Sequence, residues 1–344
     1  MILTPGQLYF INEEDIITGK RSEYYKIGIV RGAADRDSKD RLLEHQTGNP
    51  RKLCIVETID TPAVEAIETN LHYLFARNRV MGEWMSFSET ELQSAIKKAQ
   101  ELSAEILGNI DLYERAEQLK NQVSSGSKLP PTEEAEDWFA VVQDFKEVIS
   151  ACEDVNAKYY RYLQSAIARG VNVSGKAKIQ KRSAPKKFNE ALFIEKYPEL
   201  YKQYSTPTFP IRGSFRLATA KDWIPDLSVI SSEQVELITD FQEMLEGADH
   251  SLETGFALHG MHLGVLEIQK YAEWQTDVAK VNLRVLTGDS DGIDEVCTWK
   301  RAQKEIRTLD KDALQAEFPA EYEACIVEGK ETEALIVEPK IAAL

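Results

Sequence analysis

The sequence predicts an α+β protein, in which a small antiparallel three-stranded sheet with flanking helices is followed by a mostly helical duplicated module. Three observations lead to this class. Short runs of β-branched and aromatic residues alternate with helical stretches in the first hundred residues. Over much of the remaining chain, apolar residues recur at helical spacing. Two stretches of that remainder also resemble each other, as duplicated units do.

Three short segments have the composition of strands, namely Leu8–Ile11, Tyr24–Val30 and Leu53–Thr58. Between the second and the third, Asp40–His45 has the pattern of a short helix. This helix is expected to end near Thr47–Pro50, because Gly and Pro stop a helix there.

A second helix is expected after Thr61-Pro62, since proline is tolerated in the first helical turn, where its missing N–H has no helical partner. An extended segment at Gly82–Phe87 comes next. Ser88 is then expected to cap another helix, with Glu91 as its capping-box partner. The apolar positions of the helix after Pro62 recur at helical spacing: they are Val64, Ile67, Leu71, Leu74 and Phe75.

Four segments are predicted along the chain. A domain at 1–100 is followed by a helix and linker at 101–132, by a first helical repeat module with a basic segment at 133–222, and by an acidic second repeat module at 223–344. The linker is clearest at 124–131, where Ser, Gly and Pro predominate.

The duplication is predicted from two similar stretches. Lys181-Arg182 followed by Phe193–Tyr201 parallels Lys300-Arg301 followed by Leu314–Tyr322. In each stretch a short strand ends in Lys-Arg and leads to a helix broken by an aromatic-Pro step. Such a repeat suggests pseudo-symmetric packing or a duplicated surface for one kind of partner. A chance likeness between two amphipathic helices is the alternative.

The composition argues against membrane-spanning and disulfide-stabilised classes. At 344 residues the chain is long enough for two or three domains. No apolar run approaches the length of about 20 residues that spans a bilayer, and the N-terminus has no secretory signal pattern. The four cysteines are far apart in sequence and form no C-x-x-C pair. We therefore expect a cytoplasmic protein, in the host cytoplasm if it is viral.

The net charge of −16 is unevenly distributed, with +7 on residues 173–222 and −15 on residues 223–344. An acidic field slows approach to DNA, so local basic clusters would have to bind it, and salt would weaken that binding. The alternative is that the acidity only confers solubility. One basic cluster is interleaved with aromatic residues, and we expect its cations to contact DNA and the aromatic residues to form core; the cations are Lys176, Lys178, Lys181, Arg182, Lys186 and Lys187.

Five residues of the first domain supply what phosphodiester cleavage by one metal ion needs. Glu68 is a carboxylate for one Mg²⁺ or Mn²⁺, and Arg41 offers a planar fork for phosphate oxygens. His45, one turn after Arg41, could take or relay a proton near neutral pH. Tyr9 and Lys26 come from neighbouring strands, where the lysine could lower the pKa of the tyrosine.

Each of these residues has a structural alternative. Tyr9 and Tyr25 are common strand residues, Arg41 and His45 could form a solvated helix face, and Glu68 and His72, four residues apart, could share a hydrogen bond. Trp84 is expected to have a packing role rather than a catalytic one. For each residue taken alone, a structural role is commoner than a catalytic one. The order and spacing of the whole set nevertheless favour a catalytic site, with Tyr25 and His72 as further candidates.

The first domain carries an ordered set of motifs: Gly6-Gln7-Leu8-Tyr9, Tyr25-Lys26-Ile27-Gly28-Ile29, Arg41, Gln46-Thr47-Gly48-Asn49-Pro50, Glu68 with Leu71-His72, Phe75, and Gly82-Glu83-Trp84. With these motifs, residues 6–87 resemble the GIY-YIG nuclease superfamily, specifically its T5orf172 or MUG113-like branch. The resemblance implies a three-stranded sheet flanked by helices, one divalent metal on Glu68, and DNA as the substrate. It also implies that Tyr9 lies beside the scissile phosphate and Arg41 against it.

The segment departs from the superfamily pattern at three points. Lys26 replaces the second tyrosine of the name-giving motif, with Tyr25 beside it, and Val30 stands where a threonine is usual. A late asparagine that many members place near the metal has no clear counterpart, and His72 or Glu83 could take its place.

The C-terminal part resembles the tail segment of phage YqaJ-type recombination exonucleases. The likeness rests on Thr298-Trp299-Lys300-Arg301 with the following aromatic-Pro step, and on Lys181-Arg182 with Tyr197–Tyr201 and Gly213–Leu217. It implies an accessory module shared among phage or prophage DNA-processing proteins.

The sequence therefore predicts a metal-dependent DNA endonuclease of phage, prophage or bacterial origin, whose C-terminal module targets it or makes it a homo-oligomer. The alternative is a non-cleaving DNA- or protein-binding protein that retains the fold. In that reading the acidic residues at 223–344 imitate nucleic acid or dock a basic protein partner.

Overall fold

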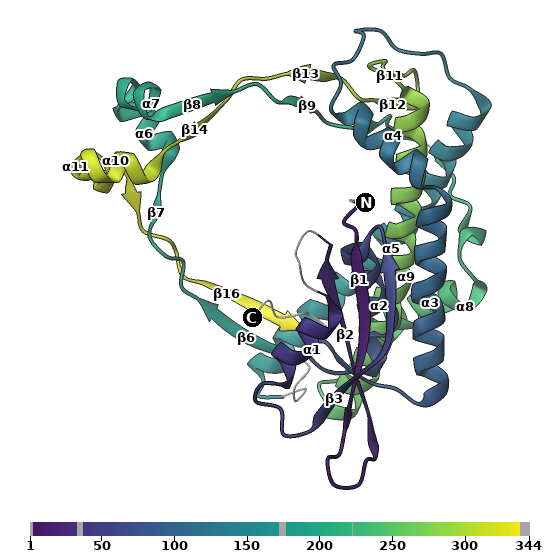
Figure 1. Cartoon of the computed structure of the whole chain (residues 1–344). Helices are drawn as coiled ribbons and strands as arrows, with labels where there is room; N and C mark the ends of the chain where they lie inside the picture. The colour runs from purple at the N-terminus through teal and green to yellow at the C-terminus, as the bar shows by residue number, and fades with distance from the viewer. Residues whose placement is uncertain (1–2, 33–36, 172–176, 222, 338–344) are drawn as a thin grey trace.

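The computed structural model describes residues 3–32, 37–171, 177–221 and 223–337 (Figure 1). Its N-terminal part is an antiparallel sheet in the order β3-β1-β2-β5-β4. The three long strands are β1 (Gly6–Glu14), β2 (Arg21–Arg31) and β3 (Lys52–Thr61). The α+β class is therefore confirmed.

The sheet has five strands, so the prediction of three was wrong. A short hairpin of β4 (Arg79–Met81) and β5 (Trp84–Ser86) turns at Gly82, which has a φ of +57° that favours glycine. β5 pairs with β2 only at Tyr24–Lys26. Strands of three residues are too short to show alternation, which is why the sequence indicated no more than an extended segment there.

The two faces of the sheet are covered by different helices because side chains alternate along each strand. On β1, Leu8 and Phe10 point to the core beneath α2 (Val64–Leu74) and α3 (Glu89–Gly108). Tyr9 and Ile11 point to the opposite face, which α1 (Ser38–Gln46) covers through Leu42. A 3-10 turn, η1 (Ala76–Asn78), follows α2, and the predicted capping box of Ser88 and Glu91 at the start of α3 is confirmed.

Two helices of 36 residues, α5 (Glu133–Ala168) and α9 (Leu252–Thr287), form an antiparallel pair about 54 Å long. Their facing residues include Tyr159 with His259 and Asn156 with His262. α9 also packs against the N-terminal domain, where Trp274 donates to Glu105 on α3 at 3.1 Å. The helical body is completed by α4 (Ile110–Lys120), η2 (Leu227–Val229) and α8 (Ser232–Glu246).

A two-stranded ribbon arches away from this body and returns to it (Figure 1). Residues 177–217 and 297–337 run antiparallel to each other along its length, in the pairs β6·β16, β7·β15, β8·β14, β9·β13 and β10·β12, with β11 added at the last pair. The bounds are β6 (Ala177–Arg182), β7 (Lys187–Phe188), β8 (Ser205–Thr208), β9 (Ile211–Gly213), β10 (Arg216–Leu217), β11 (Gly292–Ile293), β12 (Cys297–Thr298), β13 (Arg301–Gln303), β14 (Ile306–Leu309), β15 (Ile326–Val327) and β16 (Thr332–Val337).

Each end of the ribbon is anchored at a different end of the long helix pair. Ala177 and Val337, at one end, join the core formed by α5, α8 and α9. At the other end, Ile293 and Cys297 join a core with Ala135 and Leu283. The ribbon therefore spans the length of the helix pair.

Four short helices interrupt the ribbon midway, at the point of the arch that we call its tip. They are α6 (Glu190–Lys196) and α7 (Pro198–Tyr204), between β7 and β8, and α10 (Lys311–Glu317) and α11 (Pro319–Glu323), between β14 and β15. Both aromatic-Pro steps break the helix in the same way, with φ and ψ of −133° and 59° at Tyr197 and of −131° and 60° at Phe318. The sequence did not predict that the two similar stretches pair with each other as a β-ribbon. The duplication itself and the domain boundaries stay predictions.

No helix among the described residues has the length and apolar character required to cross a membrane.

Candidate active site

Tyr9 lies on β1 directly opposite Gly28 on β2, and its ring covers that glycine. A Cβ atom at Gly28 would stand 2.5 Å from the Tyr9 hydroxyl oxygen, so this ring position requires glycine. The hydroxyl is hydrogen-bonded to Nε2 of His45, 3.2 Å away on α1. Burial raises the pKa of Tyr9, although neighbouring Arg41 acts to lower it. The phenol is therefore protonated at neutral pH.

His45 is neutral at pH 7. Burial lowers its pKa from the ordinary value of 6.5, and the nearby cations Lys26 and Arg41 lower the pKa further. A neutral imidazole with an unprotonated Nε2 can accept the proton of the Tyr9 hydroxyl. The two side chains thus form a hydrogen-bonded pair on the α1 face of the sheet.

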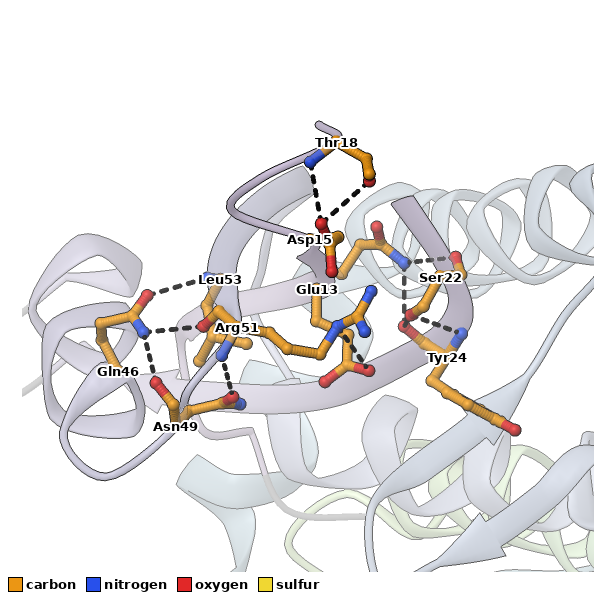
Figure 2. Close-up of polar contacts among 10 residues, drawn as sticks. Glu13, Asp15, Thr18, Ser22, Tyr24, Gln46, Asn49, Arg51 and Leu53 are labelled. Atoms are coloured by element: carbon orange, nitrogen blue, oxygen red, sulfur yellow. Dashed lines mark hydrogen bonds and ion pairs between the residues drawn. The ribbon is translucent and has the colours of Figure 1, made fainter. Parts of the chain in front are cut away.

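Gln46, the last residue of α1, fixes this helix to the sheet (Figure 2). Its Oε1 accepts a hydrogen bond from the Leu53 N–H at 2.8 Å, and its Nε2 donates to the carbonyls of Asn49 and Arg51 at 3.2 and 2.9 Å. These bonds join the end of the helix to the start of β3. They hold in place the helix that carries Arg41 and His45.

Both cations of the predicted set have acidic partners. Lys26 Nζ forms an ion pair with Glu83, and Arg41 Nη1 forms one with Glu44 at 2.6 Å. The Arg41 side chain is 36% exposed, and such helical surface pairs contribute only about 0.3–0.5 kcal/mol. Glu44 therefore holds the Arg41 guanidinium only weakly.

Glu68, on α2, is the carboxylate with the most perturbed ionisation in this region. Burial raises its pKa from 4.5 to about 7, and the negative charge of Glu83 contributes to the same shift, whereas Lys26 opposes it. The protein thus holds a carboxylate in surroundings that disfavour its negative charge. A cation bound there would remove that penalty.

His72, one turn after Glu68, is fully buried. Its Nε2 lies 3.9 Å from Glu68 Oε1, too far for a hydrogen bond. Burial, assisted by Arg79, lowers the pKa of His72 to about 4, so its ring is neutral. Neither ring nitrogen makes a hydrogen bond of ordinary length to another described residue.

The donor set fits a magnesium ion that keeps most of its water. The described ranges contain no group of three or more His, Cys, Asp or Glu side chains placed to hold a metal ion. Mg²⁺ does not require one, since it is usually bound by one or two carboxylates plus water and phosphate oxygens. Glu68, and Glu83 whose charge raises the Glu68 pKa, are the carboxylates that such an ion would have to use here.

Tyr25 lies on the other face of the sheet from Tyr9. Its ring packs against Phe87 in the core beneath α2 and α3, with 6.1 Å between ring centroids. The geometry therefore separates Tyr25 from the Tyr9–His45 pair. Trp84 packs beside Tyr9, in keeping with a packing role.

The predicted basic cluster lies on the ribbon, far along the chain from this site. Lys178, Lys181, Arg182, Lys186 and Lys187 are exposed on β6, β7 and the segment between them, and Lys176 falls outside the described residues. Two of these cations have acidic partners on the facing strand: Lys181 pairs with Glu333 at 4.0 Å and Lys186 with Glu328 at 3.2 Å. Phe193, Tyr197, Tyr201 and Tyr204 form core at the tip, as predicted.

Sequence reasoning underestimated Glu83 and Gln46. Glu83 was weighed only as a substitute for a missing asparagine, yet it pairs with Lys26 and acts on Glu68. Its position in the hairpin between β4 and β5 gave no signal. Gln46 belongs to a recognised motif, but its role became visible only through its three bonds to the backbone around β3.

Residues 6–100 match the family model of the T5orf172 domain, which agrees with the resemblance seen in the motifs. No curated protein and no solved structure matches the chain.

Proposed function

We propose that the T5orf172 domain of this chain is the catalytic domain of a metal-dependent DNA endonuclease. The proposal is supported by the hydrogen-bonded pair of Tyr9 and His45 and by the raised pKa of Glu68 in the same domain. The charges of Lys26 and Glu83, which form an ion pair, both act on the pKa of Glu68. Perturbed ionisation concentrated in one place is typical of functional sites.

Positioning of the phosphodiester is assigned to Arg41 and Lys26. Arg41 offers a bidentate fork once it exchanges Glu44 for a phosphate oxygen. Lys26, whose side chain is 12% exposed, pairs with Glu83 and would be free to bind phosphate if Glu83 helped to hold a metal ion. Both changes replace one ion pair by another, so neither leaves a buried charge unpaired.

Activation of the attacking water is assigned to Tyr9 and His45 together. The raised pKa of Tyr9 makes a free phenolate rare at pH 7, so Tyr9 alone is a poor base. In the hydrogen-bonded pair, the Tyr9 oxygen takes a proton from water while its own proton passes to Nε2 of neutral His45. The result is hydroxide in line with the phosphorus and an imidazolium ion that can later return the proton.

Glu68, with Glu83 beside it, would hold a Mg²⁺ or Mn²⁺ ion. When bound, such an ion supplies charge stabilisation to the phosphoryl oxygens and to the leaving oxygen. The protein's part is to present the Glu68 carboxylate from α2, and the bound cation would offset the burial that disfavours its charge.

The test is incubation of the purified full-length protein with supercoiled plasmid and Mg²⁺ or Mn²⁺. We expect nicking or linearisation that EDTA abolishes and that Glu68→Ala lowers at least about 100-fold. The exposed Glu65→Ala variant on the same helix serves as the matched control. Cleavage that persists in a folded Glu68→Ala protein would remove Glu68 from the site.

A non-cleaving role is the second candidate, favoured by the ion pairs that neutralise Lys26 and Arg41. In that case the domain binds DNA or protein, and the acidic residues at 223–344 dock a basic partner. Thermal stability distinguishes the two functions, since a metal site responds to Mg²⁺ and to EDTA. Self-association through the C-terminal part remains a prediction for either function.

A further inference from the structure

A groove of about 550 Å³ lies along the ribbon where β9 and β10 approach β12 and β13. Four of its eight lining residues are cationic and none is acidic: the cations are Arg212, Arg216, Lys300 and Lys304. All four side chains are exposed. The groove is thus a concentration of positive charge on a chain whose net charge is −16.

These four cations have no acidic partners within the part of the chain that the structure describes. The nearest glutamate in sequence, Glu305, instead forms an ion pair with Arg307 at 2.9 Å. The predicted basic cluster differs, since Lys181 and Lys186 pair with glutamates of the facing strand. An unpaired cation is free to bind an external anion without first breaking an ion pair.

The two arms of the ribbon also differ in total charge. Residues 205–217 and 297–309 together contain six Lys or Arg and one Glu. Residues 177–190 and 326–337 contain the same number of Lys and Arg but four Glu. The arm built from β8–β10 and β12–β14 is therefore the more positive, although the sequence shows its longest basic run on the other arm.

The backbone beneath the groove is fixed. At Gly213 a Cβ atom would lie 2.6 Å from the Lys300 carbonyl oxygen, so the two strands approach this closely only because residue 213 is glycine. Arg301, itself buried, donates from Nη2 to the Gly288 carbonyl at 2.7 Å. Ser124 of the linker donates its N–H to the Arg301 carbonyl at 3.0 Å. The four exposed cations thus extend from an ordered base.

We infer that this groove binds the phosphodiester backbone of duplex DNA, at a contact separate from Tyr9 and Glu68. The cations are spread over two strands and share no buried donor that would select one small anion, an arrangement that suits a ligand with repeated phosphates. The inference rests on the proposed function only in naming DNA as the ligand. The groove would retain the duplex while the N-terminal domain acts on it.

The test measures binding of the full-length protein to a fluorescein-labelled 30-base-pair duplex by anisotropy, in EDTA so that no cleavage occurs, over a series of NaCl concentrations. The variant combines Arg212→Ala, Arg216→Ala, Lys300→Ala and Lys304→Ala. A matched control removes the same number of charges from the other arm through Lys178→Ala, Lys181→Ala, Lys186→Ala and Lys187→Ala. A third protein, with Arg212→Lys and Arg216→Lys, keeps the charge.

The groove variant is expected to bind at least about tenfold more weakly, and the slope of log K against log salt is expected to shrink by up to about 3.6, since each phosphate contact contributes about 0.9. The control variant of the other arm should lose less than half as much binding free energy. The charge-conserving variant should bind like the wild type. Because EDTA prevents cleavage, the result is independent of whether the protein is a nuclease.

Four results would overturn the inference. The first is unchanged affinity and slope in the groove variant, and the second is an equal loss in the two arms, which would indicate only the general effect of charge. The third is displacement of DNA by inorganic phosphate beyond that caused by chloride at equal ionic strength, because a site for single phosphate ions would then explain the groove. A weakened charge-conserving variant would equally exclude a charge-based contact.

Discussion

When no cation is bound, burial disfavours the ionised form of Glu68 in the folded protein. Its pKa of about 7 in the folded state, against 4.5 for an ordinary glutamate, means that folding favours the protonated form. The resulting decrease in the free energy of unfolding is small below pH 4.5, grows as the pH rises, and reaches its full value above about pH 7. A shift of this size corresponds to about 3 kcal/mol.

Glu68→Gln should therefore stabilise the metal-free protein. We expect urea unfolding in EDTA to give a free energy of unfolding about 3 kcal/mol higher than that of the wild type at pH 8, and a difference below about 1 kcal/mol at pH 5. Mg²⁺ should stabilise the wild type at pH 8 and leave the variant unchanged. Equal stabilities at pH 8 would mean that Glu68 is not a strained carboxylate.

The Tyr9–His45 pair predicts a particular pH dependence. His45 must be neutral to accept a proton, and its pKa lies below 6.5, so it is competent across neutral pH. Glu68 must be ionised, and its pKa is about 7 in the absence of metal. At low Mg²⁺ the rate should rise between pH 6 and 8, and saturating Mg²⁺ should move this rise to lower pH.

Tyr9→Phe and His45→Ala should each lower the rate about 100- to 10,000-fold, the usual contribution of acid–base groups. Because the two act as one unit, the double variant should be hardly slower than either single variant. Rates measured by quenched-flow or gel assay check this expectation. Multiplicative losses would show that the two residues act independently.

At the scale of elements, α1 depends on its attachment to β3. Gln46→Ala removes the hydrogen bonds that the side chain makes with the backbone of Asn49, Arg51 and Leu53. We expect a loss of about 1–3 kcal/mol in stability and a lower kcat, because Arg41 and His45 shift with the helix. Gln93→Ala, which removes an exposed bond to Glu89 on α3, is the control.

A structural role alone would lower the stability of Gln46→Ala but leave its kcat unchanged at temperatures where it is fully folded. Thermal melts and kinetics on the same samples separate the two effects. A kcat equal to that of Gln93→Ala would show that the attachment of α1 does not position the site.

The same elements show what the sequence could predict. β3 and α2 have clear periodicities because one side of each faces a core, whereas β1 is a continuous apolar and aromatic run because both of its faces are covered. β4 and β5 are three residues each and leave no such pattern. The ribbon strands of two to six residues pair with the facing arm 80 to 160 positions away, as Leu217 does with Cys297 and Ala177 with Val337, so local sequence gives no indication of these pairs.

For the candidate site, sequence order indicated which residue types to consider but not how they interact. Tyr9 meets His45 only because α1 packs on the face of the sheet that carries Tyr9, and Glu83 reaches Lys26 only because a hairpin adds β5 beside β2. Glu68 and His72 have the spacing of a hydrogen-bonded pair, yet their atoms stay 3.9 Å apart. Such distances depend on packing between elements.

At the scale of the whole molecule, the ribbon brings a positive surface to an acidic protein. The helix pair of α5 and α9 fixes both ends of this ribbon, and α9 also packs on the N-terminal domain through Trp274 and Val281. A contact made on the ribbon is thus mechanically connected to the domain that carries Glu68. If the ribbon binds DNA and the N-terminal domain cleaves it, this arrangement of ribbon, helix pair and domain would join the two activities in one chain (Figure 1).

The central claim is that Glu68 and Tyr9 make this protein a metal-dependent nuclease. Its most direct test is the single-turnover cleavage of an end-labelled DNA duplex, with enzyme in excess, in Mg²⁺ or Mn²⁺, for the wild type, Tyr9→Phe and Glu68→Gln. We expect metal-dependent cleavage by the wild type and a loss of at least about 100-fold in each variant, with DNA binding retained. Absence of cleavage by a folded, DNA-binding wild type in either metal, or equal rates for all three proteins, would contradict it.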